Sequence, residues 1–213
     1  MNETKTVKYT CPYCSREFEA DIYDAVNAAD RELRDRVVSG DLFRVSCPHC
    51  KKDFMIQYPL VYIDNENRFL LWLSTQDAGE MLKGLTKPLT EQGYVLRRCE
   101  TLAEMAEKIQ ILEDGVSDVM VELAKYDCFI EFIDNKKGKA EDVTSVEYQK
   151  TENEVMKINV RTDDRGMAFL IPLQMLEEEM AQNPERYEVD NETIPVINST
   201  WITSLFMPSE GTA

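Results

Sequence analysis

The sequence predicts an α+β fold, and three observations lead to this class. Two Cys-Pro-x-Cys pairs, Cys11 to Cys14 and Cys47 to Cys50, are each flanked by alternating, strand-like residues. Helical periodicity follows in residues 102–130, and strand-like segments return after residue 142. We therefore expect N-terminal β-hairpins with a short inserted helix, a central helical segment and a small C-terminal α+β subdomain.

Composition limits the classes of protein to consider. Of the 213 residues 43% are hydrophobic, enough to build a core, and 8 Gly and 8 Pro are too few for low-complexity disorder. The 24 basic and 40 acidic residues give a net charge of −16, which repels nucleic acid and anionic membranes. No apolar run approaches the roughly 18 residues of a membrane span, and the first ten residues lack the pattern of a secretory signal. We expect a cytoplasmic protein that has another protein as its partner.

The paired cysteines predict a structural zinc site. In a chain without a signal peptide, disulfides are disfavoured. Zinc takes four thiolates at tetrahedral corners about 2.3 Å away, and two residues between cysteines let a turn direct both sulfurs at one ion. Because strand-like residues flank each pair, we expect each to lie at the tip of a β-hairpin, as in a zinc ribbon. The metal ligands that we predict are Cys11, Cys14, Cys47 and Cys50.

A short helix is expected in the insertion between the two pairs. The 32 residues from Ser15 to Ser46 exceed the 15 to 20 typical of such sites, so they must hold a folded element. Asp30 can cap a helix in which Leu33 and Val37 share one face, and Gly40 suits a left-handed residue at its end.

Thiol chemistry is the main alternative to zinc. Cys-Pro-Tyr-Cys and Cys-Pro-His-Cys also occur in glutaredoxin-like and disulfide-oxidase proteins, in which a thiolate of low pKa drives disulfide exchange. In those folds the pair opens a helix, whereas residues 17–20 and 53–58 are strand-like here. A catalytic zinc needs an open position and three protein ligands, and the spacing provides four.

The other chemistry-bearing residues point away from catalysis, and we predict no catalytic residue. His49, the only histidine, is expected to face solvent or to bond a cysteine sulfur, with zinc ligation as the alternative. Cys99 and Cys128 are expected to be small buried hydrophobic residues. The acidic residues of segment 104–122 are expected to face water instead of binding a metal.

Between residues 58 and 134 the pattern changes from strands to helices. Residues 58–63 and 68–73 predict a hairpin, 74–83 a short helix, 84–93 a loop broken by Pro88, and 94–98 a strand. Thr101 and Glu104 form a capping box before a helix that reaches residue 114. Ser117 begins a second helix that continues through Tyr126 and Ile130.

Together these segments resemble the prokaryotic CPXC-domain family, which is named for its cysteines. The resemblance covers residues 7 to about 134, and it implies a zinc-binding domain with the same four ligands and without an assigned reaction. Metal-binding turns of this kind, called zinc knuckles, usually have Gly after the second cysteine, where this chain has Ser15 and Lys51. The resemblance rests on the two cysteine pairs and on the segments 39–43, 58–64, 102–109 and 113–115.

After residue 134 a polar linker leads to the second predicted domain. We divide the chain into a zinc-binding domain, 1–134, with its ribbon at 7–63 and a hairpin and helices at 64–134, and a C-terminal α+β subdomain, 135–213. Residues 143–150, 154–162 and 167–171 predict a meander, and Pro172 can occupy the first turn of a helix that directs Leu173, Leu176 and Met180 inward. Residues 194–206 suit either a strand or a helix.

The function predicted from these patterns is that of a zinc-stabilised interaction or scaffold protein. A thiol-disulfide redox protein and a nucleic-acid-binding zinc ribbon are the alternatives. Residues 1–63 carry 9 basic and 10 acidic side chains, so the ribbon lacks the basic stripe of a nucleic-acid reader. Because few large apolar residues lie between Val7 and Ile56, we expect loss of zinc to unfold that segment locally.

Overall fold

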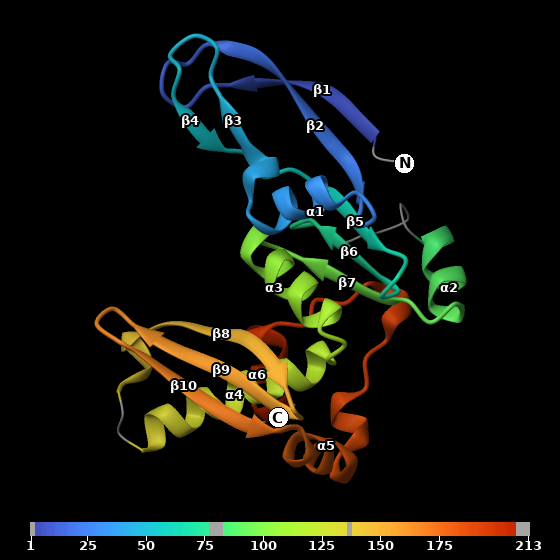
Figure 1. Ribbon diagram of the computed structural model, residues 1–213, viewed down its shortest axis with the longest axis vertical. Helices are drawn as coiled ribbons and strands as arrows, with labels where there is room; N and C mark the ends of the chain where they lie inside the picture. The colour runs from blue at the N-terminus through green and yellow to red at the C-terminus, as the bar shows by residue number, and fades with distance from the viewer. Residues whose placement is uncertain (1–2, 77–82, 136–137, 208–213) are drawn as a thin grey trace, which may run out of the picture. The chain divides into compact units, whose positions relative to one another are not determined.

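The computed structural model describes residues 3–76, 83–135 and 138–207 and has an α+β fold (Figure 1). The chain forms two compact units. The first comprises residues 1–109 with 191–195, and the second comprises residues 110–190 with 196–213. The division predicted from the sequence, at residue 134, stays a prediction.

A five-stranded mixed sheet organises the first unit, in the order β1-β2-β5-β6-β7. Strands β1/β2 and β5/β6 are antiparallel pairs, whereas β2/β5 and β6/β7 are parallel. A separate two-stranded sheet pairs β3 with β4. The strand bounds are β1 Glu3–Thr10, β2 Glu17–Asn27, β3 Arg44–Ser46, β4 Asp53–Met55, β5 Leu60–Asp64, β6 Phe69–Leu73 and β7 Val95–Cys99.

The helix predicted in the insertion is present as α1, Arg31–Val38. The Asp30 side chain accepts the backbone N–H of Leu33 at 3.2 Å, and Leu33 and Val37 are buried. Gly40, at φ +79°, reverses the chain into a 3-10 turn, Asp41–Phe43. The local pattern was sufficient to predict this helix, because its N-cap, its apolar face and its terminating glycine lie within eleven residues.

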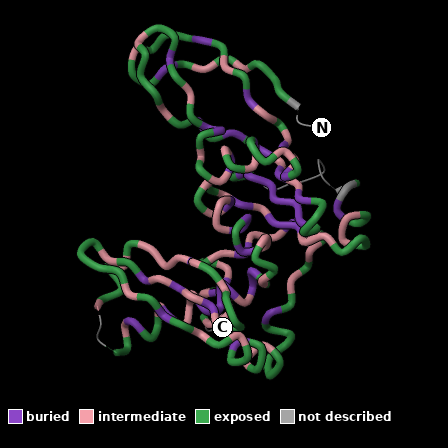
Figure 2. Tube along the Cα trace, viewed as in Figure 1, coloured by how far each residue is buried: buried purple, intermediate pink, exposed green. Residues whose placement is uncertain are grey.

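The hairpin predicted over residues 58–73 is confirmed and supplies the buried centre of the first unit. Asp64 closes its turn by accepting the backbone N–H groups of Glu66 and Asn67 at 2.8 and 2.9 Å. Every residue of β6 is buried, as expected of a strand covered on both faces. Figure 2 shows that buried residues concentrate in β5 and β6, whereas exposed residues are frequent along the β1–β2 hairpin.

The loop predicted over residues 84–93 is wrong, because the chain forms helix α2, Lys83–Glu91, with Pro88 inside it. The Pro88 ring removes one backbone hydrogen bond. Packing offsets that loss, since Leu89 contacts a cluster that contains Leu70, Trp72 and Leu96. Most of the helix predicted at 74–83 lies outside the described residues.

Both central helices begin as the capping patterns predict. Helix α3, Leu102–Glu113, starts with a capping box in which Thr101 Oγ1 accepts the Glu104 N–H at 3.1 Å. Glu104 in turn accepts the Thr101 N–H. The Ser117 hydroxyl caps α4, Asp118–Asp134, by accepting the Met120 N–H at 3.5 Å. Asp118 and Glu122 of this helix are buried, so the expectation that the acidic residues of segment 104–122 face water is wrong for these two.

The second unit contains the predicted antiparallel meander, in the order β10-β9-β8. Its core packs the sheet against α4, α5 and α6, and includes Phe132, Met156, Ile158, Leu176 and Ile202. The ambiguous segment 194–206 contributes a helix. The element bounds are 3-10 turn Ala140–Asp142, β8 Val143–Glu152, β9 Val155–Thr162, β10 Gly166–Pro172, α5 Leu173–Gln182, 3-10 turns Pro184–Tyr187 and Asn191–Thr193, and α6 Ser199–Phe206.

Residues 191–195 return to the sheet of the first unit, which the sequence did not indicate. The Arg98 N–H donates to the Pro195 carbonyl at 3.1 Å, and the buried Arg97 donates to the Asn191 side chain. Ile194 is buried in the same apolar cluster as Trp72. Among the described residues, no helix has the length and apolar character needed to cross a bilayer.

Two neighbouring carboxylates in the second unit are expected to make its stability depend on pH. Asp127 of α4 lines a small cavity with Glu131 of α4 and Glu179 of α5. Burial, and secondarily the charge of Glu179, raise the pKa of Asp127 to about 6. The Tyr187 hydroxyl donates to Glu179 at 2.8 Å, which keeps that second carboxylate in place.

We expect Asp127→Asn to change the pH dependence of unfolding of the second unit. The pKa of Asp127 in the folded state lies above the ordinary value near 3.9. Its contribution to the free energy of unfolding is therefore fully present below about pH 4. It is lost as the pH rises through about 6. The variant should therefore be more stable than wild type at pH 7 and lack this decline. Trp201 fluorescence in a Trp72→Phe background would report the unfolding, with exposed Asp163→Asn as the control. Equal pH profiles for wild type and Asp127→Asn would contradict the assignment.

Candidate metal centre

The two cysteine pairs form turns with the same backbone hydrogen bonds. The first turn joins β1 to β2, and the second joins β3 to β4. In the first, the Cys11 N–H donates to the Arg16 carbonyl at 3.0 Å and the Ser15 N–H donates to the Cys11 carbonyl at 2.9 Å. In the second, the Cys47 N–H donates to the Lys52 carbonyl at 3.0 Å and the Lys51 N–H donates to the Cys47 carbonyl at 2.9 Å. Both pairs therefore lie at hairpin tips, as the flanking residues predicted.

The four sulfur atoms converge with the spacing of a tetrahedral thiolate site. Cys11 Sγ lies 3.7 Å from Cys50 Sγ, Cys14 Sγ lies 3.7 Å from Cys47 Sγ, and all four lie within 4.8 Å of one another. Zinc–sulfur bonds of about 2.3 Å place tetrahedral ligands about 3.8 Å apart. A disulfide needs sulfurs about 2.05 Å apart. The four predicted residues are thus brought together, in a geometry that could hold a metal ion.

Apolar side chains enclose the inner half of the cluster. Cys11 and Cys47 are 1% and 0% exposed, whereas Cys14 and Cys50 are half-buried. The ring of Phe54 meets Phe18 edge-on at 6.1 Å and Tyr13 at 6.3 Å. This cluster, which also contains Tyr9 and Val45, is the local core of the two hairpin tips.

The electrostatics of the turns favour a thiolate at Cys47. Desolvation raises its pKa, but backbone N–H groups of Cys50 and His49, with the neighbouring thiols, outweigh that effect and lower the pKa to about 6. At Cys14 a backbone N–H at Arg16 lowers the pKa. Desolvation and the three other thiols outweigh it and raise the pKa to about 11. The Cys47 thiol is therefore expected to ionise before the Cys14 thiol.

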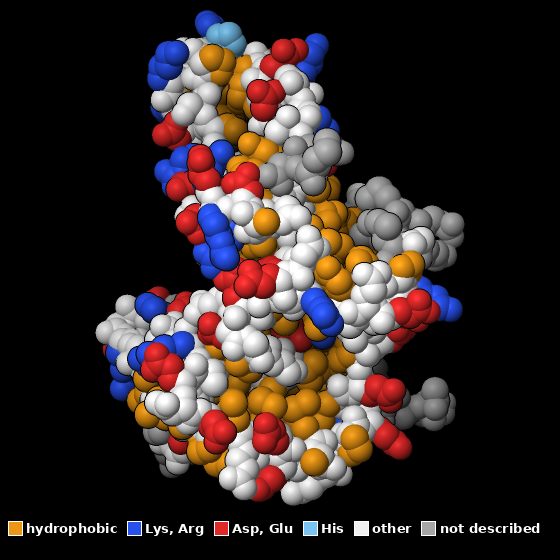
Figure 3. Space-filling view, turned by 45° about the vertical axis from the view of Figure 1, so that its right-hand side comes forward, with side chains coloured by type: hydrophobic (Ala, Val, Ile, Leu, Met, Phe, Trp, Pro, Cys, Tyr) orange, Lys and Arg blue, Asp and Glu red, His pale blue; other side chains and the backbone are white. Residues whose placement is uncertain are grey.

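Basic side chains around the tips balance the charge of a metal–thiolate site. Segments 8–19 and 44–55 hold five basic and three acidic residues. Four thiolates with one divalent ion would carry −2, which this excess of two positive charges would neutralise. Figure 3 shows the single histidine at the tip of the ribbon, with both basic and acidic side chains nearby.

His49 connects the two turns. Its Nε2 lies 3.2 Å from the Glu17 carbonyl, and its side chain is exposed. The predicted exposure of His49 is confirmed, and its hydrogen-bond partner is the backbone of β2 and not a cysteine sulfur. Cys99 and Cys128 are buried, at 1% and 2% exposure, and stand outside the four-cysteine cluster. Burial raises the pKa of Cys128 to about 12, which suits its predicted role as a small apolar side chain.

Two residues adopt strained conformations immediately after the cysteine pairs. Ser15 and Lys51 have φ of 58° and 61°, in the left-handed region that costs an ordinary residue roughly 1–2 kcal/mol. These are the positions at which knuckles usually have Gly. Both turns form their backbone hydrogen bonds although Ser15 and Lys51 occupy these positions instead of Gly.

The comparison with known families matches residues 9–125 to the CpXC protein model. Because this match spans more than half of the chain, the protein belongs to the CpXC family. The resemblance noted from the cysteine pairs is confirmed. No curated protein and no solved structure matched the chain.

We expect Ser15→Gly and Lys51→Gly to stabilise the metal-loaded hairpin tips. Glycine removes the left-handed strain but adds unfolded-state entropy, so the net gain should be about 0.5–1 kcal/mol for each variant. Competition with a chromogenic chelator and thermal unfolding would measure the gain. Arg16→Gly and Lys52→Gly, the next positions in each turn, are the matched controls and should lose stability. Loss of metal affinity in both Ser15→Gly and Lys51→Gly would contradict the strain argument.

Proposed function

We propose that this CpXC protein binds one zinc ion through Cys11, Cys14, Cys47 and Cys50, and that the ion holds a surface in shape for another protein. The observation that carries the proposal is the convergence of four sulfurs with tetrahedral spacing. A set of four thiolates favours zinc or iron over the hard cations, which prefer oxygen ligands. Four protein ligands leave no coordination position for water or substrate, so the ion's role is structural.

The redox alternative has one observation in its favour and two against it. The lowered pKa of Cys47 suits a reactive thiolate. However, each pair joins two strands instead of opening a helix, so no helix N-terminus stabilises the thiolate. The 3.7 Å sulfur contacts also join cysteines of different pairs, which supports one shared ion over two separate dithiols.

The nucleic-acid alternative finds little electrostatic support. The five basic residues of the hairpin tips are offset by three carboxylates and by the charge of the metal site. A reader of nucleic acid needs a net positive face that releases counterions from phosphates.

Exposed side chains at the tips support protein as the partner. Tyr13 is 57% exposed and Met55 is 48% exposed. Aromatic residues and Met are enriched at protein interfaces. The Lys52 ammonium lies 4.7 Å from the centre of the Tyr13 ring, which holds the ring in place at the surface. Because Tyr13 lies between two proposed ligands, loss of zinc would also displace this contact surface.

We expect purified protein to contain one zinc ion per chain, measured by native mass spectrometry and elemental analysis. Replacement by cobalt(II) should give the intense thiolate charge-transfer absorption of a four-sulfur tetrahedral site. Cys47→Ser should weaken metal binding by at least tenfold, while Cys99→Ser and Cys128→Ser, which alter cysteines outside the cluster, should keep one ion. Metal-free protein with a Cys11–Cys14 or Cys47–Cys50 disulfide would favour the redox alternative instead.

The partner proposal is tested with a photo-reactive amino acid placed at Tyr13. Cross-linking in cells should yield a discrete protein adduct at this position, and the same probe at Thr6, an exposed residue of β1, is the control. With the probe at Met55 we expect an adduct to the same partner protein. Adding Tyr13→Ser to that chain should reduce the adduct several-fold without changing the zinc content. A cross-link to RNA alone, or equal adducts from Thr6 and Tyr13, would contradict the proposal.

A further inference from the structure

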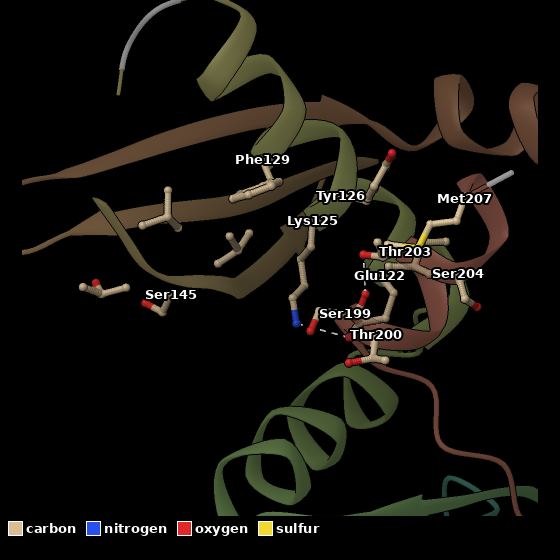
Figure 4. A pocket seen from close by; sticks show the side chains of 14 residues that line it. Glu122, Lys125, Tyr126, Phe129, Ser145, Ser199, Thr200, Thr203, Ser204 and Met207 are labelled. Carbon is tan, nitrogen blue, oxygen red and sulfur yellow. Dashed lines mark hydrogen bonds and ion pairs between the residues drawn. The ribbon is translucent and has the colours of Figure 1, made fainter. Parts of the chain in front are cut away.

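The second unit contains a cavity that is separate from the cysteine cluster. Helix α4, strand β8 and helix α6 surround a space of about 590 Å³ that is open to solvent on one side. Figure 4 shows side chains from all three elements around this space. The volume lies within the range of roughly 300–1,000 Å³ that is typical of pockets for small organic ligands.

The cavity has an apolar wall of fixed shape. Tyr126 and Phe129 of α4, Val146 of β8 and Ile202 of α6 line it. The ring of Tyr126 stacks on Phe206 with centroids 4.5 Å apart and planes 6° apart. Such packing restricts the rotamer of Tyr126, so this wall is formed before any ligand arrives. An apolar molecule could therefore be enclosed without a large rearrangement.

A buried charge pair forms the polar part of the same cavity. Lys125 Nζ lies 3.2 Å from Glu122 Oε1, and their side chains are 12% and 2% exposed. In Figure 4 both side chains reach toward Ser199 and Thr200, at the start of α6. Burial of two charges costs several kcal/mol per ion in desolvation, so an ion pair beside an apolar wall is a weak way to stabilise a fold. An apolar pocket with a few convergent polar groups is, by contrast, the usual design of a site that orients an amphipathic ligand.

The surrounding charge selects the ligand's polar group. The second unit carries 9 basic and 21 acidic residues, so its field attracts cations and repels anions. Glu122 is more deeply buried than Lys125, so Glu122 is the fixed member of the pair and presents its negative charge to the cavity. The aromatic side chains of Tyr126 and Phe129 line the same cavity, and aromatic rings attract cations.

We propose that this cavity binds an amphipathic organic amine. Its ammonium exchanges with Lys125 at the Glu122 carboxylate, and its apolar body lies against Tyr126, Phe129 and Ile202. The side chain of Lys125 is partly exposed, so it can turn to solvent when its place is taken. The site lies wholly in the second unit, and the proposal does not depend on the metal centre.

Three probes with the same body and different polar groups test the proposal: 4-phenylbutylamine, 4-phenylbutanol and 4-phenylbutyrate. Titration calorimetry on the zinc-loaded full chain should show the amine binding at least about tenfold more tightly than the other two, since only the amine can take the place of Lys125 at the Glu122 carboxylate and let the Lys125 ammonium regain its hydration. Tightest binding of the alcohol or the carboxylate would overturn the proposal. So would the absence of saturable binding of all three.

Variants locate the binding and its charge preference. Thr203→Phe, which fills the cavity from α6, should abolish binding, whereas the similarly sized Thr203→Val should preserve it. Glu122→Gln should reduce the preference for the amine over the alcohol and the carboxylate to about threefold or less. Glu178→Gln on α5, which makes the same charge change away from the cavity, is the control. If the single variant unfolds, the double variant Glu122→Gln/Lys125→Gln removes both members of the ion pair and serves in its place. Amine binding that survives Thr203→Phe, or keeps its preference in both Glu122 variants, would refute the assignment.

Discussion

The convergence of four cysteine sulfurs is the constraint on which the shape of the N-terminal ribbon depends. The two turns that supply them belong to different sheets, since β1 and β2 extend the five-stranded sheet while β3 and β4, within the described part of the chain, pair only with each other. Three-residue strands such as β3 and β4 provide too few hydrogen bonds to persist alone. The small aromatic cluster around Phe54 and the contact from His49 to Glu17 are modest additions. Binding of a structural zinc ion, at about 10 kcal/mol or more, would exceed these contributions.

The influence of the metal is expected to end where the hydrophobic core begins. The same strand β2 that starts beside the first cysteine turn places Ile22 and Val26 in the interior, and the insertion adds Leu33 and Val37. The sequence alone suggested that all of residues 7–56 would depend on zinc. Because these four side chains are buried, the rest of the segment has apolar burial of its own, and we expect the dependence to be confined to the hairpin tips, residues 8–19 and 44–55.

Local patterns were predictable from the sequence, and long-range pairings were not. The cysteine spacing, the caps at Asp30 and Ser117 and the C-terminal meander depend on neighbouring residues, and the structure agrees with each. The parallel pairing of β2 with β5 joins segments that no local pattern connects. The return of residues 191–195 to the first unit is equally non-local. Pro88 misled the local interpretation, because tertiary packing of α2 overrode an unfavourable helix residue. The amine cavity was likewise beyond the sequence, since its walls come from three separated elements.

Hydrogen exchange measured segment by segment, with and without prolonged chelation under reducing conditions, tests the central claim most directly. We expect removal of metal to abolish protection in residues 8–19 and 44–55 while residues 20–38 and 60–73 keep theirs, because only the tips depend on the four thiolates. Unchanged protection of the tips after the metal has been removed would contradict a structural role for the ion. Loss of protection throughout the first unit would contradict the boundary between the metal-dependent tips and the hydrophobic core.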